Sequence, residues 1–135
     1  MYKKNDDKIQ PLISTLLELT RNDKIHWKYL DDDEPLEGLV HGVYNEEDMS
    51  TEIFSGLCFI APYKQGFFAV TEIIDVFGGG PRKISLAIIP ALDSRSSSTA
   101  DSPQSDLVRL HNLIKSKFPN VDTFIDEFLD EFKGF

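Results

Sequence analysis

The side chains that most often do chemistry are spread along this chain and are not grouped at the spacing that metal binding or catalysis needs. The chain has one cysteine, Cys58, and three widely separated histidines, His26, His41 and His111. Zinc sites need several such ligands in close pairs, and a cysteine nucleophile needs a base partner, which the sequence does not place beside Cys58. We therefore predict no catalytic residue, no metal and no cofactor, and favour a protein that is not an enzyme.

Two segments resemble ion-binding loops in part. Residues 31–34 are four consecutive carboxylates, but a calcium loop that began there would need glycine at its sixth position and glutamate at its twelfth, where this chain has Leu36 and Gly42. Residues 78–83, Gly-Gly-Gly-Pro-Arg-Lys, have glycines and cations that suit a phosphate. A phosphate loop leads into a helix, however, and residues 84–89 have the pattern of a strand. We interpret both segments as turns.

Four polar residues are candidates for a ligand pocket. Glu72 and Asp75 lie within the most apolar stretch, where a carboxylate is solvated, paired with a cation, or raised in pKa inside a pocket. If the protein bound a small ligand or were an enzyme, these two residues, His41 and Tyr44 would line a pocket between sheet and helices.

The net charge of −9 is concentrated in one segment. No Lys or Arg occurs between Lys28 and Lys64, and nine carboxylates lie there. Nucleic acids and anionic membranes bind clusters of Lys and Arg, so we predict neither as a partner. A basic protein is the partner that this charge favours. The predicted partner-binding residues are Asp31, Asp32, Asp33, Glu34, Glu37, Glu46, Glu47 and Asp48.

The centre of the chain predicts an antiparallel β-meander. Three apolar runs, residues 51–61, 67–77 and 82–89, are separated by turns that contain glycine and proline. Residues 24–30 alternate as a half-buried strand does, and residues 38–44 are a weaker strand candidate because two glycines lower their β-propensity. Apolar residues at both odd and even positions leave neither face of the first two meander strands suited to water.

Three stretches repeat apolar residues at intervals of three and four, as amphipathic helices do: residues 9–20, 107–114 and 121–132. We interpret the last and clearest of them as a helix packed on the core, and the alternative is a helix that binds in a partner's groove. The predicted fold is α+β, with a meander of four to five strands. The N-terminal helix and the two C-terminal helices pack on one face of the sheet.

One domain, residues 1–135, accounts for the whole chain. Residues 93–103 are rich in serine and contain no apolar side chain larger than alanine, so we predict a mobile loop there. The lone cysteine and the lack of a signal-peptide or membrane-spanning run predict a cytoplasmic protein.

The order of these elements resembles that of small uncharacterised bacterial α+β domains. Their opening pattern, Leu-Leu-x-x-Thr followed by Ile-x-Trp, corresponds here to a Leu-rich first helix and then Lys24-Ile25-His26-Trp27-Lys28. A strand meander and a closing helix that includes residues 110–114 follow. The resemblance covers most of the element order and implies no established activity.

The function that these patterns favour is non-catalytic binding of a macromolecule by a cytosolic bacterial domain, in the manner of an acidic inhibitor or immunity-like protein. Two alternatives remain open: a small-ligand-binding or enzymatic domain, and a structural subunit of a homo-oligomer. With all helices on one sheet face, the other face would keep an open apolar patch, and this predicts a two-fold symmetric dimer through that face.

Overall fold

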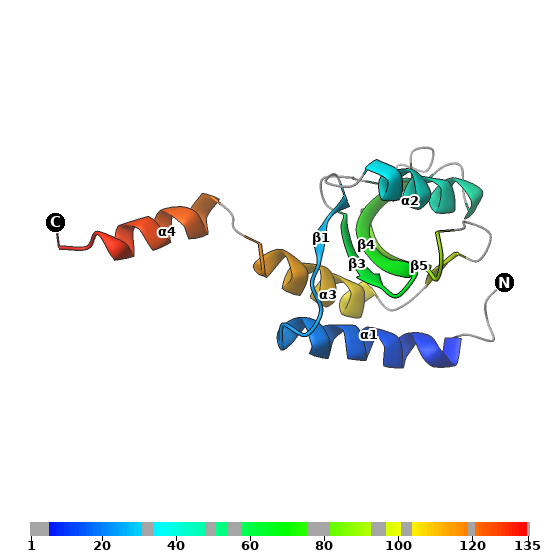
Figure 1. Ribbon diagram of the computed structural model, residues 1–135, viewed down its shortest axis with the longest axis horizontal. Coiled ribbons are helices and arrows are strands. Elements are labelled where there is room, and N and C mark those ends of the chain that lie inside the picture. The colour runs from blue at the N-terminus through cyan, green and yellow to red at the C-terminus, as the bar shows by residue number, and fades with distance from the viewer. Residues whose placement is uncertain are drawn as a thin grey trace.

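The computed structural model describes residues 6–30, 34–47, 51–53, 58–75, 82–92, 97–100, 104–118 and 121–134. It confirms the predicted α+β class, with helices on both sides of an antiparallel sheet and one helix that extends away from the rest (Figure 1). The helices are α1 (Asp6–Arg21), α2 (Glu34–Glu47), α3 (Gln104–Ser116) and α4 (Val121–Glu131). The strands are β1 (Lys28–Tyr29), β2 (Thr51–Ile53), β3 (Phe59–Tyr63), β4 (Gly66–Asp75), β5 (Lys83–Ile89) and β6 (Ser98–Ala100).

Five strands lie side by side in the order β1-β3-β4-β5-β6, which fits the predicted four to five. The short strand β2 pairs with the end of β4 that β3 does not reach. Glu52 of β2 lies opposite Ile74, whereas the pairing of β3 with β4 ends where Phe59 lies opposite Val70. Each of these pairings is antiparallel. Strand β4, with ten residues, is therefore the element on which the rest of the sheet is assembled.

Each face of the sheet is covered by helices. Successive residues of a strand point to opposite faces, so Phe68 and Val70 of β4 face α1 and α3, whereas Phe67 and Ala69 face α2. The buried cluster on the first face is Ile13, Leu16, Leu17, Phe59, Val70, Ile84, Leu86, Leu107, Leu110 and Ile114. The cluster on the second face is Leu30, Val40, Val43, Tyr44, Cys58, Ile60, Phe67, Ala69, Ala87 and Ile89.

A cluster of aromatic side chains fixes the carboxyl end of α3 to the sheet. The ring centroid of Phe59 lies 5.5 Å from that of His111 and 5.1 Å from that of Phe118, and the Tyr29 ring lies 4.6 Å from Phe118. Phe118 lies two residues after the end of α3, so these contacts hold the chain between α3 and α4. We refer to the described residues up to Phe118 as the body.

Helix α2 corrects the prediction of a weak strand at residues 38–44 and of a turn at Glu34, whereas residues 31–33 of that predicted turn lie outside the described residues. Residues 34–47 are helical, and their apolar side chains repeat at three and four: Leu36, Leu39, Val40, Val43 and Tyr44. Glycine lowers helix propensity, but packing of this stripe on the sheet outweighs that cost. Gly38 and Gly42 are therefore tolerated inside the helix.

The position of α2 also corrects the prediction that all helices lie on one face. Because α2 covers the second face, the open apolar patch on which the predicted dimer depended does not exist among the residues that the structure describes.

Strand β6 lies inside the serine-rich stretch for which a mobile loop was predicted. Its residues pair with β5, with Ser98 opposite Ile88 and Ala100 opposite Leu86. An edge strand is held by backbone hydrogen bonds and needs few apolar side chains, so small polar residues suffice there. Residues 93–96 and 101–103 of that stretch, including Arg95, lie outside the described residues.

Helix α4 corrects the prediction that both C-terminal helices pack on the sheet. None of its residues is buried, and it points away from the body (Figure 1). Of the two C-terminal helices, α3 alone packs on the sheet, on the same face as α1.

The helical state of residues 34–47 predicts that alanine at Gly38 or Gly42 stabilises the protein. A Cβ added at either position meets nothing within 4 Å, and alanine has the higher helix propensity, so each substitution should raise the free energy of unfolding by about 0.5–1 kcal/mol. Urea unfolding followed by circular dichroism measures this change.

Gly66 provides the matched control. A Cβ there would collide with the backbone of Ile89 and Pro90, so Gly66→Ala should lower stability. Loss of stability in both Gly38→Ala and Gly42→Ala would contradict a helix at residues 34–47.

Candidate interaction surface

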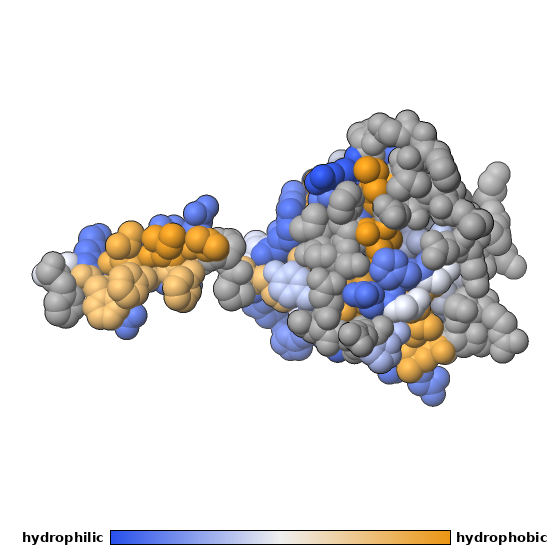
Figure 2. All heavy atoms as spheres, turned by 90° about the horizontal axis from the view of Figure 1, so that it is seen from above, coloured by the Kyte–Doolittle hydropathy of each residue, from blue (hydrophilic) through white to orange (hydrophobic). Residues whose placement is uncertain are grey.

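The largest group of exposed apolar side chains in the described structure lies on α4 and the residue after it. The exposed fractions are 73% for Val121, 67% for Phe124, 47% for Ile125, 56% for Phe128, 59% for Leu129 and 45% for Phe132. Figure 2 shows them as a continuous apolar face along the projecting helix. We call these six side chains the α4 stripe. Single exposed apolar residues are ordinary, but a contiguous exposed apolar stripe usually marks an interaction site.

Carboxylates border the α4 stripe on both sides. At 3.6 residues per turn, Asp122 and Asp126 fall along one border, and Glu127 and Glu131 fall along the other. With Asp130 on the far side, α4 has five carboxylates, and the residues after it add one cation, Lys133. The segment therefore combines an apolar face with a net charge of −4.

Neither the sheet nor α3 offers an apolar surface for the α4 stripe in the part of the chain that the structure describes. Both faces of the sheet are already covered, and the outward face of α3 is largely polar. Its exposed residues include Ser105, Arg109, Asn112 and Lys115. The rings of Phe128 and Phe132 contact each other, with centroids 4.9 Å apart, but this contact lies within the stripe itself.

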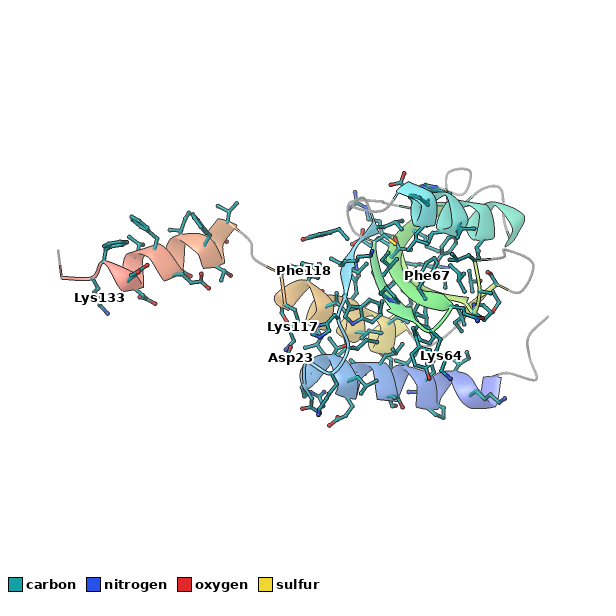
Figure 3. The ribbon with its side chains drawn as sticks, viewed as in Figure 1. Asp23, Lys64, Phe67, Lys117, Phe118 and Lys133 are labelled. Atoms are coloured by element: carbon teal, nitrogen blue, oxygen red, sulfur yellow. The ribbon has the colours of Figure 1, made fainter. Side chains whose placement is uncertain are left out.

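A hollow lies in the body where α1 and α3 end, next to the start of α4. Its lining residues are Asp23, Ile25, His26, Trp27, Lys117 and Phe118. Figure 3 shows Asp23, Lys117 and Phe118 together at this end of the molecule. Trp27 is held in place because its indole N–H donates a 3.0 Å hydrogen bond to the Thr20 hydroxyl.

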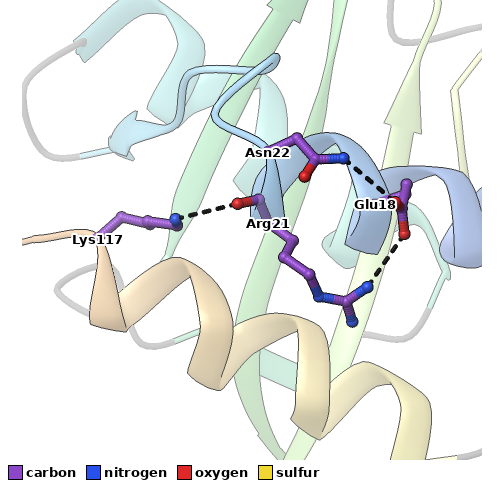
Figure 4. Close-up of polar contacts among 4 residues, drawn as sticks. All are labelled: Glu18, Arg21, Asn22 and Lys117. Carbon is purple, nitrogen blue, oxygen red and sulfur yellow. Dashed lines mark hydrogen bonds and ion pairs between the residues drawn. The ribbon is translucent and has the colours of Figure 1, made fainter.

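Lys117 joins the two helix ends at the hollow. Its ammonium group lies 3.1 Å from an Asp23 carboxylate oxygen. It also donates a 3.5 Å hydrogen bond to the carbonyl of Arg21, at the end of α1 (Figure 4). A cation beside the last carbonyl of a helix is favourable because the helix dipole is negative there. Asp23, with φ of 56°, turns the chain away from α1 in the left-handed conformation.

The sheet separates two of the four predicted pocket residues, Tyr44 and Glu72. Tyr44 packs in the cluster on the α2 face, whereas Glu72 shares the α1 and α3 face with Val70, two residues before it in β4. Glu72 is paired with Arg82, at 3.7 Å, as a strand carboxylate commonly is. His41 is half-buried on α2, and Asp75 ends β4 opposite Thr51. Tyr44 and Glu72 therefore lie on opposite sides of the sheet and cannot act on one ligand.

The predicted acidic partner-binding segment is described only in part. Glu37 is half-buried on α2. Glu34, Glu46 and Glu47 belong to α2, but their side chains, like the whole of Asp31, Asp32, Asp33 and Asp48, lie outside what the structure describes.

Two classes of site receive no support from the described part of the chain. It contains no group of three or more His, Cys, Asp or Glu side chains placed to hold a metal ion. None of its helices combines the length and the apolar character that a bilayer-spanning helix needs.

The exposure of the α4 stripe predicts that its side chains contribute little to the stability of the isolated protein. Phe124→Ala and Phe128→Ala should each change the free energy of unfolding by less than about 0.5 kcal/mol. Thermal or urea unfolding of the full chain measures this.

Phe59→Ala, at a ring that is 1% exposed, is the matched large-to-small control and should cost about 3–5 kcal/mol. A comparable loss in Phe128→Ala would mean that α4 packs on the body in solution.

Comparisons of the chain with protein-family models, with curated proteins and with solved structures find no match. The resemblance to bacterial domains that open with Leu-Leu-x-x-Thr and Ile-x-Trp stays a prediction, and what this chain does has to be inferred from its own surfaces.

Proposed function

We propose that this protein is a non-catalytic bacterial domain that acts in the cytoplasm by binding another protein, in the manner of an acidic inhibitor or immunity-like partner. The observation that supports this function is the α4 stripe, in which six apolar side chains are 45–73% exposed and bordered by carboxylates. Such a surface is suited to binding and supplies no catalytic group.

The partner's surface follows from the chemistry of α4. A short amphipathic helix binds most of its apolar face when it lies in an apolar groove, with anchors at positions i, i+3, i+4 and i+7. Phe124, Ile125 and Phe128 have that spacing counted from Val121. Full burial of one such side chain contributes about 1.5–3 kcal/mol, so three or four anchors supply enough gross free energy for a specific complex.

The carboxylates on both borders of the stripe specify the rim of the groove. A groove lined by acidic residues would place like charges side by side, whereas Lys and Arg on both rims would pair with Asp122, Asp126, Glu127 and Glu131. The acidic segment of residues 31–52 adds long-range attraction for the same basic partner.

Photo-crosslinking tests this function. A photoreactive phenylalanine analogue at position 128 of the full chain, in the cells that make the protein, should give a discrete adduct whose mapped contact site is apolar with Lys or Arg beside it. The same analogue at Asp130, on the opposite side of α4, is the control and should give little adduct. Equal crosslinking from both positions would contradict binding through the stripe.

Charge substitutions on α4 should change the rate of association with the partner so identified. Neutralising Asp122, Asp126, Glu127 and Glu131 to Asn and Gln should slow association about tenfold or more at low salt, because electrostatic steering raises association rates by that order. Lys133→Gln, which removes the one cation, should accelerate it. Stopped-flow measurements at low and high salt check both, and rates that do not depend on salt would contradict a basic rim.

A further inference from the structure

The hollow at the end of α1 and α3 combines three apolar lining residues, Ile25, Trp27 and Phe118, with three polar ones, Asp23, His26 and Lys117. Trp27, Ile25 and Phe118 are half-buried, and Phe118 is held in place by its ring contacts with Tyr29 and Phe59. The α4 helix of the same chain starts near this point and runs outward, away from Asp23, Lys117 and Phe118 (Figure 3).

The charge around the hollow is opposite to that of α4. Two ion pairs, Arg21–Glu18 and Lys117–Asp23, are internal to this end of the body. Lys24 and Lys115, both exposed and each within two residues of a lining residue, add two further positive charges. Such a basic group is unusual in a chain with a net charge of −9, and it is opposite in sign to a helical segment with a net charge of −4.

Pairing of two α4 helices with each other would be less favourable than contact of α4 with the surface around the hollow. An antiparallel pair that matches apolar residues across the seam would bring Asp126 of both copies together, and likewise Glu127 of both copies. A helix of 11 residues is also short, because stable dimers bury about 1,200–2,000 Å² in total. Contact with a surface that carries extra positive charge beside apolar rings removes the repulsion.

We infer that α4 of one copy packs over the Trp27–Phe118 hollow of a second copy, and that the exchange is reciprocal in a two-fold symmetric dimer. This inference rests on the proposed function of α4 as the binding element, and it makes the second copy and the basic partner competitors for the same stripe. Two reciprocal contacts also double the area that a single α4 buries.

The chain has a single tryptophan, Trp27, and this makes the hollow directly observable. Over a dilution series of the full chain, sedimentation velocity should show a monomer–dimer equilibrium, and Trp27 emission should shift to the blue as the dimer forms. Phe128→Ser should abolish both changes. A blue-shifted emission that does not vary with concentration, in a monomer, would show that α4 folds back on its own body and would overturn the inference.

Charge reversal identifies the contact. Lys24→Glu with Lys115→Glu should weaken the dimer at least about tenfold, and so should Asp126→Lys with Glu127→Lys. A chain that carries all four changes should regain most of the affinity. The matched control is Lys8→Glu with Lys64→Glu, which makes the same charge change away from the hollow and should leave the dimer unaffected.

The two proposals fail separately. A chain that stays monomeric at 100-fold dilution and at the highest concentration reached, with constant Trp27 emission, overturns the dimer but leaves crosslinking to another protein at position 128 unaffected. A dimer that forms as described, without any crosslink from position 128 to a basic partner, instead overturns the proposed function. Dimerisation that survives both charge reversals would place the interface elsewhere and overturn the inference.

Discussion

The apolar character of β4 on both of its sides is the constraint on which the rest of the structure depends. Phe67 and Ala69 need cover on one face and Phe68 and Val70 on the other, and a sheet has only two faces. Helices α1 and α3 supply the first cover and α2 supplies the second. The two buried clusters account for the hydrophobic stabilisation of the body, and neither cluster includes a residue of α4. The exposure of α4 follows from this division.

Much of the fold was predictable from local patterns. The antiparallel meander, the three helices with clear apolar spacing and the buried position of Cys58 all follow from periodicity and composition. The main error concerned residues 34–47, where we predicted a weak strand and a turn instead of a helix. The apolar residues there are spaced at three and four, but we gave more weight to the two glycines. The sequence contains the correct signal, in Leu36, Val40, Val43 and Tyr44, but only the uncovered sheet face decides between strand and helix. Strand β6 was missed because backbone pairing leaves no hydrophobic pattern.

The interaction surface was harder to predict than the fold, for a physical reason. The pattern of residues 121–132 is the same whether the helix packs on its own core or on a partner, because both surfaces are apolar. What separates the two cases is whether the body has a free face, and that depends on α2. The hollow could not be predicted either, since Asp23 and Lys117 are far apart in sequence. Glu72 and Tyr44 looked alike as polar residues near apolar ones, yet the fold places them on opposite sides of the sheet.

The side-chain amide of Gln104 binds backbone groups of β5 that would otherwise be open to a further strand. Its side chain accepts a 2.9 Å hydrogen bond from the Ile84 N–H and donates a 2.8 Å bond to the Ile84 carbonyl, next to the stretch of β5 that β6 covers. Those backbone groups would otherwise form an open strand edge, which can template the addition of a foreign strand. On the opposite edge, β1 covers only Phe59 and Ile60 of β3, and exposed Pro62 lacks the N–H that a further strand would need. At Ile84 and at Pro62 the sheet is thus a poor template for a further strand, which counters β-aggregation in a protein that exposes an apolar helix.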